Sequence, residues 1–205
     1  MEVLFRNVRE LVEKAEKENK LISEIMIEQE ILITERTREE IMSQMDRNLT
    51  VMEEAVEKGL KGVRSTSGLT GGDAVLLQAY MKKGNSLSGE LMLDAVSKAV
   101  ATNEVNAAMG TICATPTAGS AGVVPGTLFA VKNKLNPTRE QMIRYLFTAG
   151  AFGFVVANNA SISGAAGGCQ AEVGSAAGMA AAAIVEMAGG TPAQSSEAFE
   201  KNKKN

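Results

Sequence analysis

Glycine and proline are confined to the later part of this chain, and that asymmetry constrains its fold more than any other feature. All 20 glycines and all 4 prolines lie at or after Gly59. Because these residues interrupt helices most strongly, their absence from residues 1–58 favours long uninterrupted helices there. We expect amphipathic helices over residues 1–64, a helical main domain over 65–198 and a polar tail over 199–205.

The apolar pattern of the first part predicts amphipathic helices. One is expected around Val8–Ala15, and a second from Ser23, as the N-cap, to Ile33. Thr37 and Glu40 have the spacing of a capping box, in which each side chain accepts from the other residue's N–H group. A third helix should follow, with an apolar stripe that favours a core face over the alternative, a surface for a partner helix: Ile41, Met45, Leu49, Met52, Val56 and Leu60.

The glycine-containing body also reads as helices. We expect them over Ser88–Ala108, with Leu91, Ala95 and Ala99 on one face, and over Thr138–Ala157 and Glu172–Gly189. Alanine and glycine in these segments permit close helix packing, and no alternation is long enough to predict a strand. The expected fold class is therefore all-α. It is a compact bundle of Ala/Gly-rich helices with glycine-rich loops that form the site, preceded by charged amphipathic helices.

Composition excludes several kinds of function. The chain has no histidine, which excludes a Ser-His-Asp triad or an HExxH zinc site within it. A net charge of −3 gives no electrostatic reason to expect nucleic acid or an anionic membrane as a partner. No targeting signal or membrane span is visible, and two cysteines fit a reducing compartment. We expect a soluble cytoplasmic protein.

Four glycine-containing polar segments suggest a binding site. They are Arg64–Asp73, Asn103–Gly110, Thr115–Gly122 and Asn158–Glu172. Successive backbone N–H groups in such turns form nests that bind carboxylates or phosphates, especially at helix N-termini. Any one of these segments is as well explained by a plain loop. The four together favour a shared site for a small anion.

The two cysteines differ in their surroundings. Cys113 lies among apolar and small residues, so we expect a buried, inert thiol. Cys169 follows Gly167 and Gly168 at an expected junction between loop and helix. A helix N-terminus there would favour the thiolate, which can ligate a metal.

The segments together resemble the α subunit of the bacterial iron–sulfur-dependent L-serine dehydratases. The resemblance covers nearly all of residues 20–198. It rests on residues 23–30 (SEIMIEQE), 67–73 (SGLTGGD), 103–106 (NEVN) with 114–122 (ATPTAGSAG), and 162–174 (ISGAAGGCQAEVG). The last two are the most specific.

The resemblance implies a mostly helical enzyme that deaminates L-serine to pyruvate and ammonia by β-elimination of water. It implies a [4Fe–4S] cluster that acts as a Lewis acid, no pyridoxal phosphate, and a β subunit as partner. Cys169 matches a cluster cysteine of the family, whereas no catalytic residue is assigned. The residues that match motifs around the substrate are Ser67, Gly68, Thr70, Gly71, Asn106, Thr117, Gly119, Ser120 and Ser163. Among them, Thr117 and Ser120 would hold the carboxylate.

The family continues beyond the point that corresponds to Asn205, and its other cluster cysteines lie in that continuation. We therefore expect further cluster ligands outside this chain and little or no activity from the chain alone. Glu172 would either pair with charge near the cluster or cap the helix that follows it.

Other functions remain open at the level of sequence. A relative of the same fold would release sulfide from L-cysteine. An inactive scaffold would bind a β subunit without turnover. A pyridoxal-phosphate dehydratase is disfavoured, because the four segments contain no lysine and no strands are evident.

Overall fold

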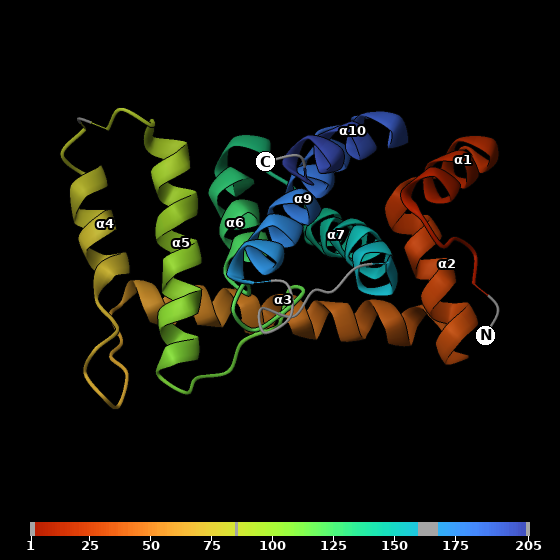
Figure 1. Ribbon diagram of the computed structural model, residues 1–205. Coiled ribbons are helices and arrows are strands. Elements are labelled where there is room, and N and C mark those ends of the chain that lie inside the picture. Colours follow the sequence, from red (N-terminus) through yellow and green to blue (C-terminus); the bar gives the residue numbers. More distant parts are fainter. Residues whose placement is uncertain (1–2, 85, 160–167, 204–205) are drawn as a thin grey trace. The chain divides into compact units, whose positions relative to one another are not determined.

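A computed structural model describes residues 3–84, 86–159 and 168–203 of the chain. The regular structure in these ranges is helical, which confirms the all-α fold class (Figure 1). None of the described helices is both long enough and apolar enough to span a lipid bilayer. Backbone contacts divide the chain into unit 1, residues 1–49 and 137–205, and unit 2, residues 50–136. The boundaries expected at residues 64 and 198 stay a prediction.

Unit 1 is built around contacts between its later helices. Its elements are α1 (Val8–Glu18), α2 (Ile22–Thr34), the first half of α3 (Arg38–Leu60), α7 (Arg139–Asn159), α9 (Cys169–Met187) and α10 (Pro192–Lys203). Gly153 of α7 brings Met179 of α9 close to the backbone, and Gly178 does the same for Phe199 of α10. The rings of Phe152 and Phe199 pack with centroids 4.7 Å apart. These small residues therefore allow the close packing expected for the body.

Unit 2 places one helix between two neighbours. Besides the second half of α3, it contains α4 (Asp73–Met81), α5 (Glu90–Ala107) and α6 (Val123–Leu135). Helix α5 packs against both α4 and α6 (Figure 1). A Cβ atom on Gly59 of α3 would lie 2.2 Å from the carbonyl oxygen of Ala101, and one on Gly122 would lie 2.2 Å from that of Ala99. The backbones of α3 and of the α6 N-terminus thus approach α5 too closely for any side chain at these positions.

Capping by nearby residues follows the sequence signals. The N–H group of Thr37 donates to the Glu40 carboxylate at 2.9 Å, and the N–H group of Glu40 donates to the Thr37 hydroxyl at 3.3 Å. This confirms the predicted capping box. Thr138 and Gln141 form the same arrangement at the start of α7. In the stripe that follows the first box, Ile41, Leu49, Met52 and Val56 are buried, as expected.

Two expectations about helix ends are wrong. Ser23 does not cap α2, because the helix already begins at Ile22 and the buried Ser23 hydroxyl has no partner among the described residues. Glu172 does not cap the following helix, because α9 begins at Cys169 and Glu172 lies inside its first turn. The sequence patterns also did not predict helices α4, α6 and α10.

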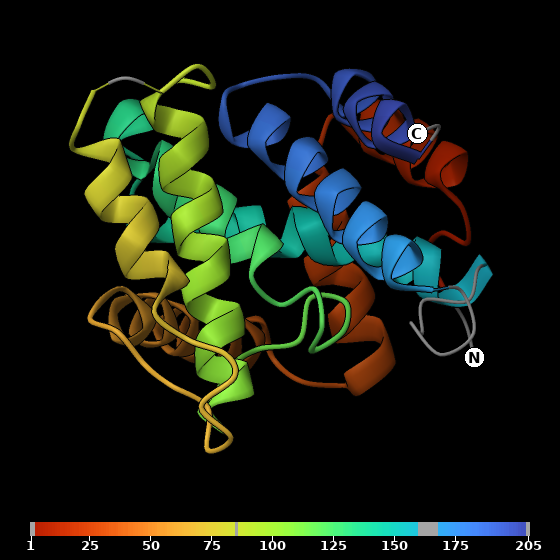
Figure 2. The same cartoon turned by 60° about the vertical axis from the view of Figure 1, so that its left-hand side comes forward.

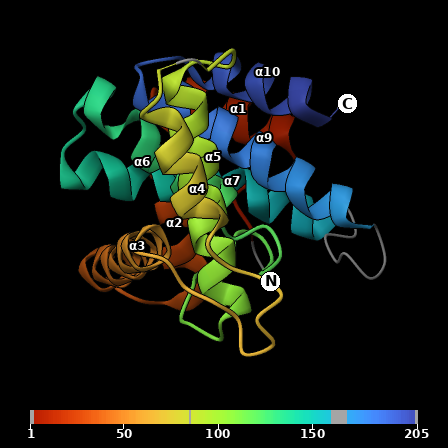
Figure 3. The same ribbon diagram turned by 90° about the vertical axis from the view of Figure 1, so that its left-hand side faces the viewer.

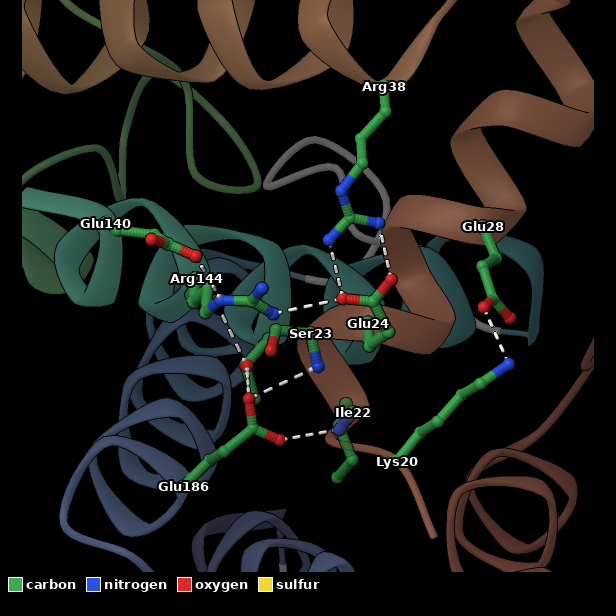
Figure 4. A network of polar contacts seen from close by, with 10 residues as sticks. Lys20, Ile22, Ser23, Glu24, Glu28, Arg38, Glu140, Arg144 and Glu186 are labelled. Carbon is green, nitrogen blue, oxygen red and sulfur yellow. Dashed lines mark hydrogen bonds and ion pairs between the residues drawn. The ribbon is translucent and has the colours of Figure 1, made fainter. Parts of the chain in front are cut away.

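A network of charged side chains joins α2, α3, α7 and α9 within unit 1 (Figure 4). Arg38 binds both carboxylate oxygens of Glu24, at 2.5 and 2.7 Å, and Arg144 donates to Glu24 at 3.1 Å. At the start of α2, the carboxylate of Glu186 accepts from the N–H groups of Ile22 (2.6 Å) and Ser23 (3.2 Å). The N-terminal cap of α2 therefore comes from α9, far along the chain.

The Glu24 network predicts a specific loss of stability in acid. Hydrogen bonds from Arg38, and more weakly from Arg144, lower the pKa of Glu24 to about 2, well below its ordinary value. The ionised form therefore stabilises the fold fully above about pH 4.5, and this contribution is lost as the pH falls towards 2. We expect Glu24→Gln to lower the free energy of unfolding at pH 7 by about 1–2 kcal/mol, a figure reduced for solvent screening. The difference from wild type should shrink to near zero at pH 2. Circular dichroism during denaturation at several pH values measures both.

Glu13→Gln is the control, because it removes an exposed pair with Arg9. Its free energy of unfolding should follow that of wild type at every pH. A loss in this control equal to that of Glu24→Gln would contradict the role assigned to Glu24.

The glycine at the contact between α3 and α5 predicts a second effect. Gly59→Ala places a methyl group against the Ala101 backbone and should destabilise the chain by about 1–3 kcal/mol through overpacking. Gly150→Ala is the matched control, because the added Cβ would meet no atom within 4 Å apart from its chain neighbours and the nearby backbone of α7. It should stabilise the chain by up to about 1 kcal/mol, the helix-propensity difference. Thermal unfolding of both variants tests the pair, and equal melting temperatures would refute the close approach.

Candidate functional site

Three of the four glycine-containing segments meet within unit 2, at the C-terminal end of α5. Asn103–Gly110 includes the last turn of α5, Arg64–Asp73 leads into α4, and Thr115–Gly122 leads into α6. Both loops lie beside the end of α5 (Figures 2 and 3). Glu104 of α5 binds the end of the first loop, and Asn106 binds the second loop. These three segments contain eight of the predicted residues: Ser67, Gly68, Thr70, Gly71, Asn106, Thr117, Gly119 and Ser120.

Glu104 of α5 fixes the end of the first loop. It is only 2% exposed, and its Oε1 atom accepts from the N–H groups of Asp73 (2.6 Å) and Ala74 (3.4 Å). The N-cap residue of α4, Gly72, has no side chain to cap the helix. The carboxylate therefore satisfies unpaired N–H groups at the positive end of the α4 dipole. This interaction holds the loop and helix α4 against α5.

Sequence reasoning did not single out Glu104 as a functional residue, although a signal was present. Glu104 shares a helix face with the buried residues Ser97 and Ala101. An acidic residue on such a face requires partners, because an unpaired buried charge is unfavourable. Its second oxygen, Oε2, is buried and has no partner among the described residues. One carboxylate oxygen is thus left unused by the fold.

The first loop closes on itself below an exposed tip. The Ser65 N–H group donates to the Thr70 carbonyl at 2.8 Å, and the Thr70 N–H group donates to the Ser65 hydroxyl at 3.1 Å. Ser67 and Gly68 are exposed between them. Gly71 adopts a φ of +129°, and a Cβ atom there would lie 2.1 Å from the Val63 carbonyl oxygen. Only glycine fits this position, so the turn orients Ser67 and Thr70 on a defined backbone.

The second loop is closed by Ser120 and tied to α5 by Asn106. The buried Ser120 hydroxyl donates to the Thr115 carbonyl at 3.0 Å and lies 3.2 Å from the Thr117 hydroxyl. The Asn106 amide donates to the Ala118 carbonyl at 3.1 Å. Both polar side chains therefore shape the loop, whereas Thr117 is half-buried and Gly119 is exposed.

Unused backbone donors gather in this second loop. The N–H groups of Ala118, Gly119 and Ser120 donate to no other atom in the part of the chain that the structure describes. Only Ala121 and Gly122 separate them from Val123, the first residue of α6. Consecutive free N–H groups next to a helix N-terminus bind anions well. The expectation of an anion site is thus supported by the backbone as well as by the hydroxyls.

The fourth segment belongs to unit 1. Ser163 lies outside the described residues, as do all of residues 160–167. Cys169 is exposed and is the first residue of α9, after Gly168 with a φ of +79°. This confirms that Cys169 lies at a helix N-terminus. Cys113 is half-buried in unit 2, and burial raises the pKa of its thiol, in agreement with an unreactive role.

The described residues do not by themselves fit a [4Fe–4S] cluster. Such clusters are held by several cysteine thiolates. Within residues 3–84, 86–159 and 168–203, no three Cys, Asp or Glu side chains are grouped to hold a metal. Cys169 is chemically suited to provide a single ligand, because its thiol is exposed at a helix N-terminus.

The cap provided by Glu104 predicts local protection from hydrogen exchange. Glu104→Ala leaves the Asp73 and Ala74 N–H groups without an acceptor, so their exchange should accelerate more than tenfold, equivalent to about 1.4 kcal/mol or more. Glu104→Gln keeps an oxygen acceptor and should retain most of the protection. Amide exchange measured by NMR distinguishes them, with the α6 amides as an internal reference. Wild-type exchange rates in Glu104→Ala would show that the cap is unimportant.

Comparisons with known proteins identify the family. A family model described as serine dehydratase alpha chain matches residues 17–205. A probable L-serine dehydratase alpha chain from Bacillus subtilis (strain 168) is 79% identical over 96% of this chain and 65% of the relative. The L-serine dehydratase alpha chain of Peptoniphilus asaccharolyticus is 38% identical over 93% of this chain and 66% of the relative. L-serine dehydratase TdcG of Escherichia coli (strain K12) is 34% identical over 96% of this chain and 44% of the relative. The chain therefore spans about two-thirds or less of the length of these curated relatives, and it belongs to the serine dehydratase alpha chain family.

Proposed function

We propose that this chain provides the substrate-binding part of an L-serine dehydratase. The reaction removes the α-proton of L-serine and expels the β-hydroxyl as water. The resulting aminoacrylate becomes an imine and takes up water to give pyruvate and ammonia. The names of the relatives support the reaction. The observation that carries the proposal in this chain is the row of unused N–H groups at Ala118, Gly119 and Ser120.

In this proposal the second loop binds the carboxylate of L-serine. The three N–H groups and the Thr117 hydroxyl donate to the two carboxylate oxygens. Ser120 and Asn106 hold the loop in shape through their bonds to Thr115 and Ala118. Charge-assisted hydrogen bonds of this kind are about twice as strong as neutral ones. The carboxylate is therefore the group that fixes the orientation of the substrate.

The first loop provides polar groups for the rest of the substrate. Ser67 and Thr70, on a turn that requires Gly68 and Gly71, would contact the amino and hydroxyl groups of L-serine. Glu104 is a positioning residue, because it fixes this loop through the N-terminus of α4. Ser163 is proposed for the same site on the resemblance of its segment alone. No residue is assigned as the base.

We further propose that Cys169 is one ligand of a [4Fe–4S] cluster. The bound cluster would supply a Lewis acid for the departing hydroxyl group. Its remaining ligands would come from residues outside this chain, and a β subunit would complete the enzyme. An oxygen-sensitive cluster requires a reducing compartment, so the proposal includes a cytoplasmic location. Because the cluster is proposed as the cofactor, the proposal does not include pyridoxal phosphate.

The carboxylate assignment is tested by removing one hydroxyl group. In the assembled enzyme, purified without oxygen together with the β subunit and the remaining α-chain segment, Thr117→Val should lower kcat/KM for L-serine about tenfold or more. This is the loss expected for one hydrogen bond to a charged group. Thr66→Val removes an exposed hydroxyl group from the neighbouring loop and serves as the matched control. Pyruvate formation measures both variants, and unchanged kinetics in Thr117→Val would contradict its role.

The same assembly tests the reaction itself. Pyruvate formation from L-serine, with iron bound in wild type and reduced iron content in Cys169→Ser, would support the proposal. An assembly that binds no iron and forms no pyruvate would refute it. Faster release of sulfide from L-cysteine than of pyruvate from L-serine would instead indicate a desulfidase of the same fold. Tight binding of the β subunit without turnover of either amino acid would indicate a scaffold.

A further inference from the structure

Unit 1 contains a cavity that the proposed reaction does not use. Its volume is about 230 Å³, and it is formed by residues of α2, the turn after α2, the first half of α3 and α7. Ile41, Met45 and Phe147 provide apolar wall, and Glu30, Arg36 and Gln44 provide polar wall. Sites for drug-sized ligands usually occupy about 300–1,000 Å³. This cavity therefore suits a smaller metabolite.

Glu30 is the unusual group in the wall. Its side chain is half-buried and forms no ion pair or hydrogen bond with any described residue. Glu24 and Glu28 on the same helix pair with Arg38 and Lys20 (Figure 4). Burial raises the pKa of Glu30, and the positive charge of Arg36 offsets this only in part. A desolvated carboxylate without a partner is unfavourable unless a cation binds it.

Arg36 provides the opposite charge at the edge of the cavity. Its exposed guanidinium also has no ion pair or hydrogen bond within the described part of the chain. Arg36 and Gln44 line both the cavity and an adjoining groove of about 480 Å³ that is open to solvent. The groove gives a ligand a way in. The cavity thus offers an anion and a cation that form no direct ion pair with each other, and an apolar wall, within a small volume.

We propose that this cavity binds a small α-amino acid. The ammonium group would pair with Glu30 and the carboxylate with Arg36, and an aliphatic side chain would contact Ile41, Met45 and Phe147. The site lies wholly in unit 1 and is separate from the candidate site in unit 2. Because the ligand would bridge α2 and α3, binding stabilises unit 1 by mass action.

The test is a titration of the full chain with L-valine, which lacks a β-leaving group and reports binding only. Methyl signals of Met45 and Ile41, followed by NMR, should shift with saturation. Glycine should bind more weakly, since it lacks an aliphatic side chain, and methylammonium and acetate should each bind more weakly than L-valine. The proposal would be overturned if L-valine shifts none of these signals at up to about 100 mM, which is about 100 times a Kd of 1 mM.

Variants separate a ligand site from a structural role. Glu30→Gln should weaken L-valine binding about tenfold or more, while its melting temperature stays equal to or above that of wild type. Glu35→Gln, an exposed neighbour at the end of α2 that does not line the cavity, should bind as wild type does. Arg36→Gln provides a second test at an exposed position, and it should also weaken binding. Equal affinity of Glu30→Gln and wild type would refute the proposed ammonium contact.

The outcome is independent of the proposed enzyme activity. Thr117→Val should leave the Met45 and Ile41 shifts unchanged, because Thr117 belongs to unit 2. If L-valine binding depends on Thr117 and not on Glu30, the proposal of a second site fails and the site in unit 2 gains support. If the assembled enzyme forms no pyruvate but Glu30-dependent binding persists, the proposed function fails alone.

Discussion

Buried carboxylates at helix N-termini organise both units of this chain. Glu104 binds the first N–H groups of α4, and Glu186 binds those of α2. Neither helix has a side-chain cap of its own. In each case the acid comes from another helix, so one interaction satisfies backbone donors and also joins two elements. Because Glu104 ends the loop that carries Ser67 and Thr70, the candidate site depends on this interaction directly.

The structural features that could be predicted from the sequence are those that depend only on residues close together along the chain. The capping box of Thr37 and Glu40 and the apolar stripe that follows it require only residues within a few turns, and the structure confirms both. Ser23 failed as a cap because a distant acid occupies the α2 N-terminus instead. The preference for Ser, Thr, Asp or Asn at the N-cap concerns only the residue that precedes the helix. It does not reveal that a carboxylate 164 positions away caps α2.

The candidate site divides in the same way. Its residue types were recognisable, because glycine, hydroxyl and amide groups recur in short segments. The structural role of each side chain could not be recognised from the sequence. Ser120 is buried and turned towards its own loop, and Asn106 binds a carbonyl group. These side chains shape backbone donors, and the donors form the anion site that we propose. Short hydroxyl and amide side chains favour such local hydrogen bonds. A sequence motif does not show whether such a side chain binds its own loop or a ligand.

The placement of the Glu186 cap has a consequence for how the chain is made. Unit 2 is continuous along the chain, whereas unit 1 combines residues 1–49 with residues 137–205. During translation, α2 leaves the ribosome before the residue that caps it has been synthesised. At about 5–20 residues per second, Glu186 follows Ile22 by some tens of seconds or less. Helices α1 and α2 therefore spend this interval without α7 and α10, their partners from the later part of the chain. Every segment of unit 2 is synthesised before Glu186.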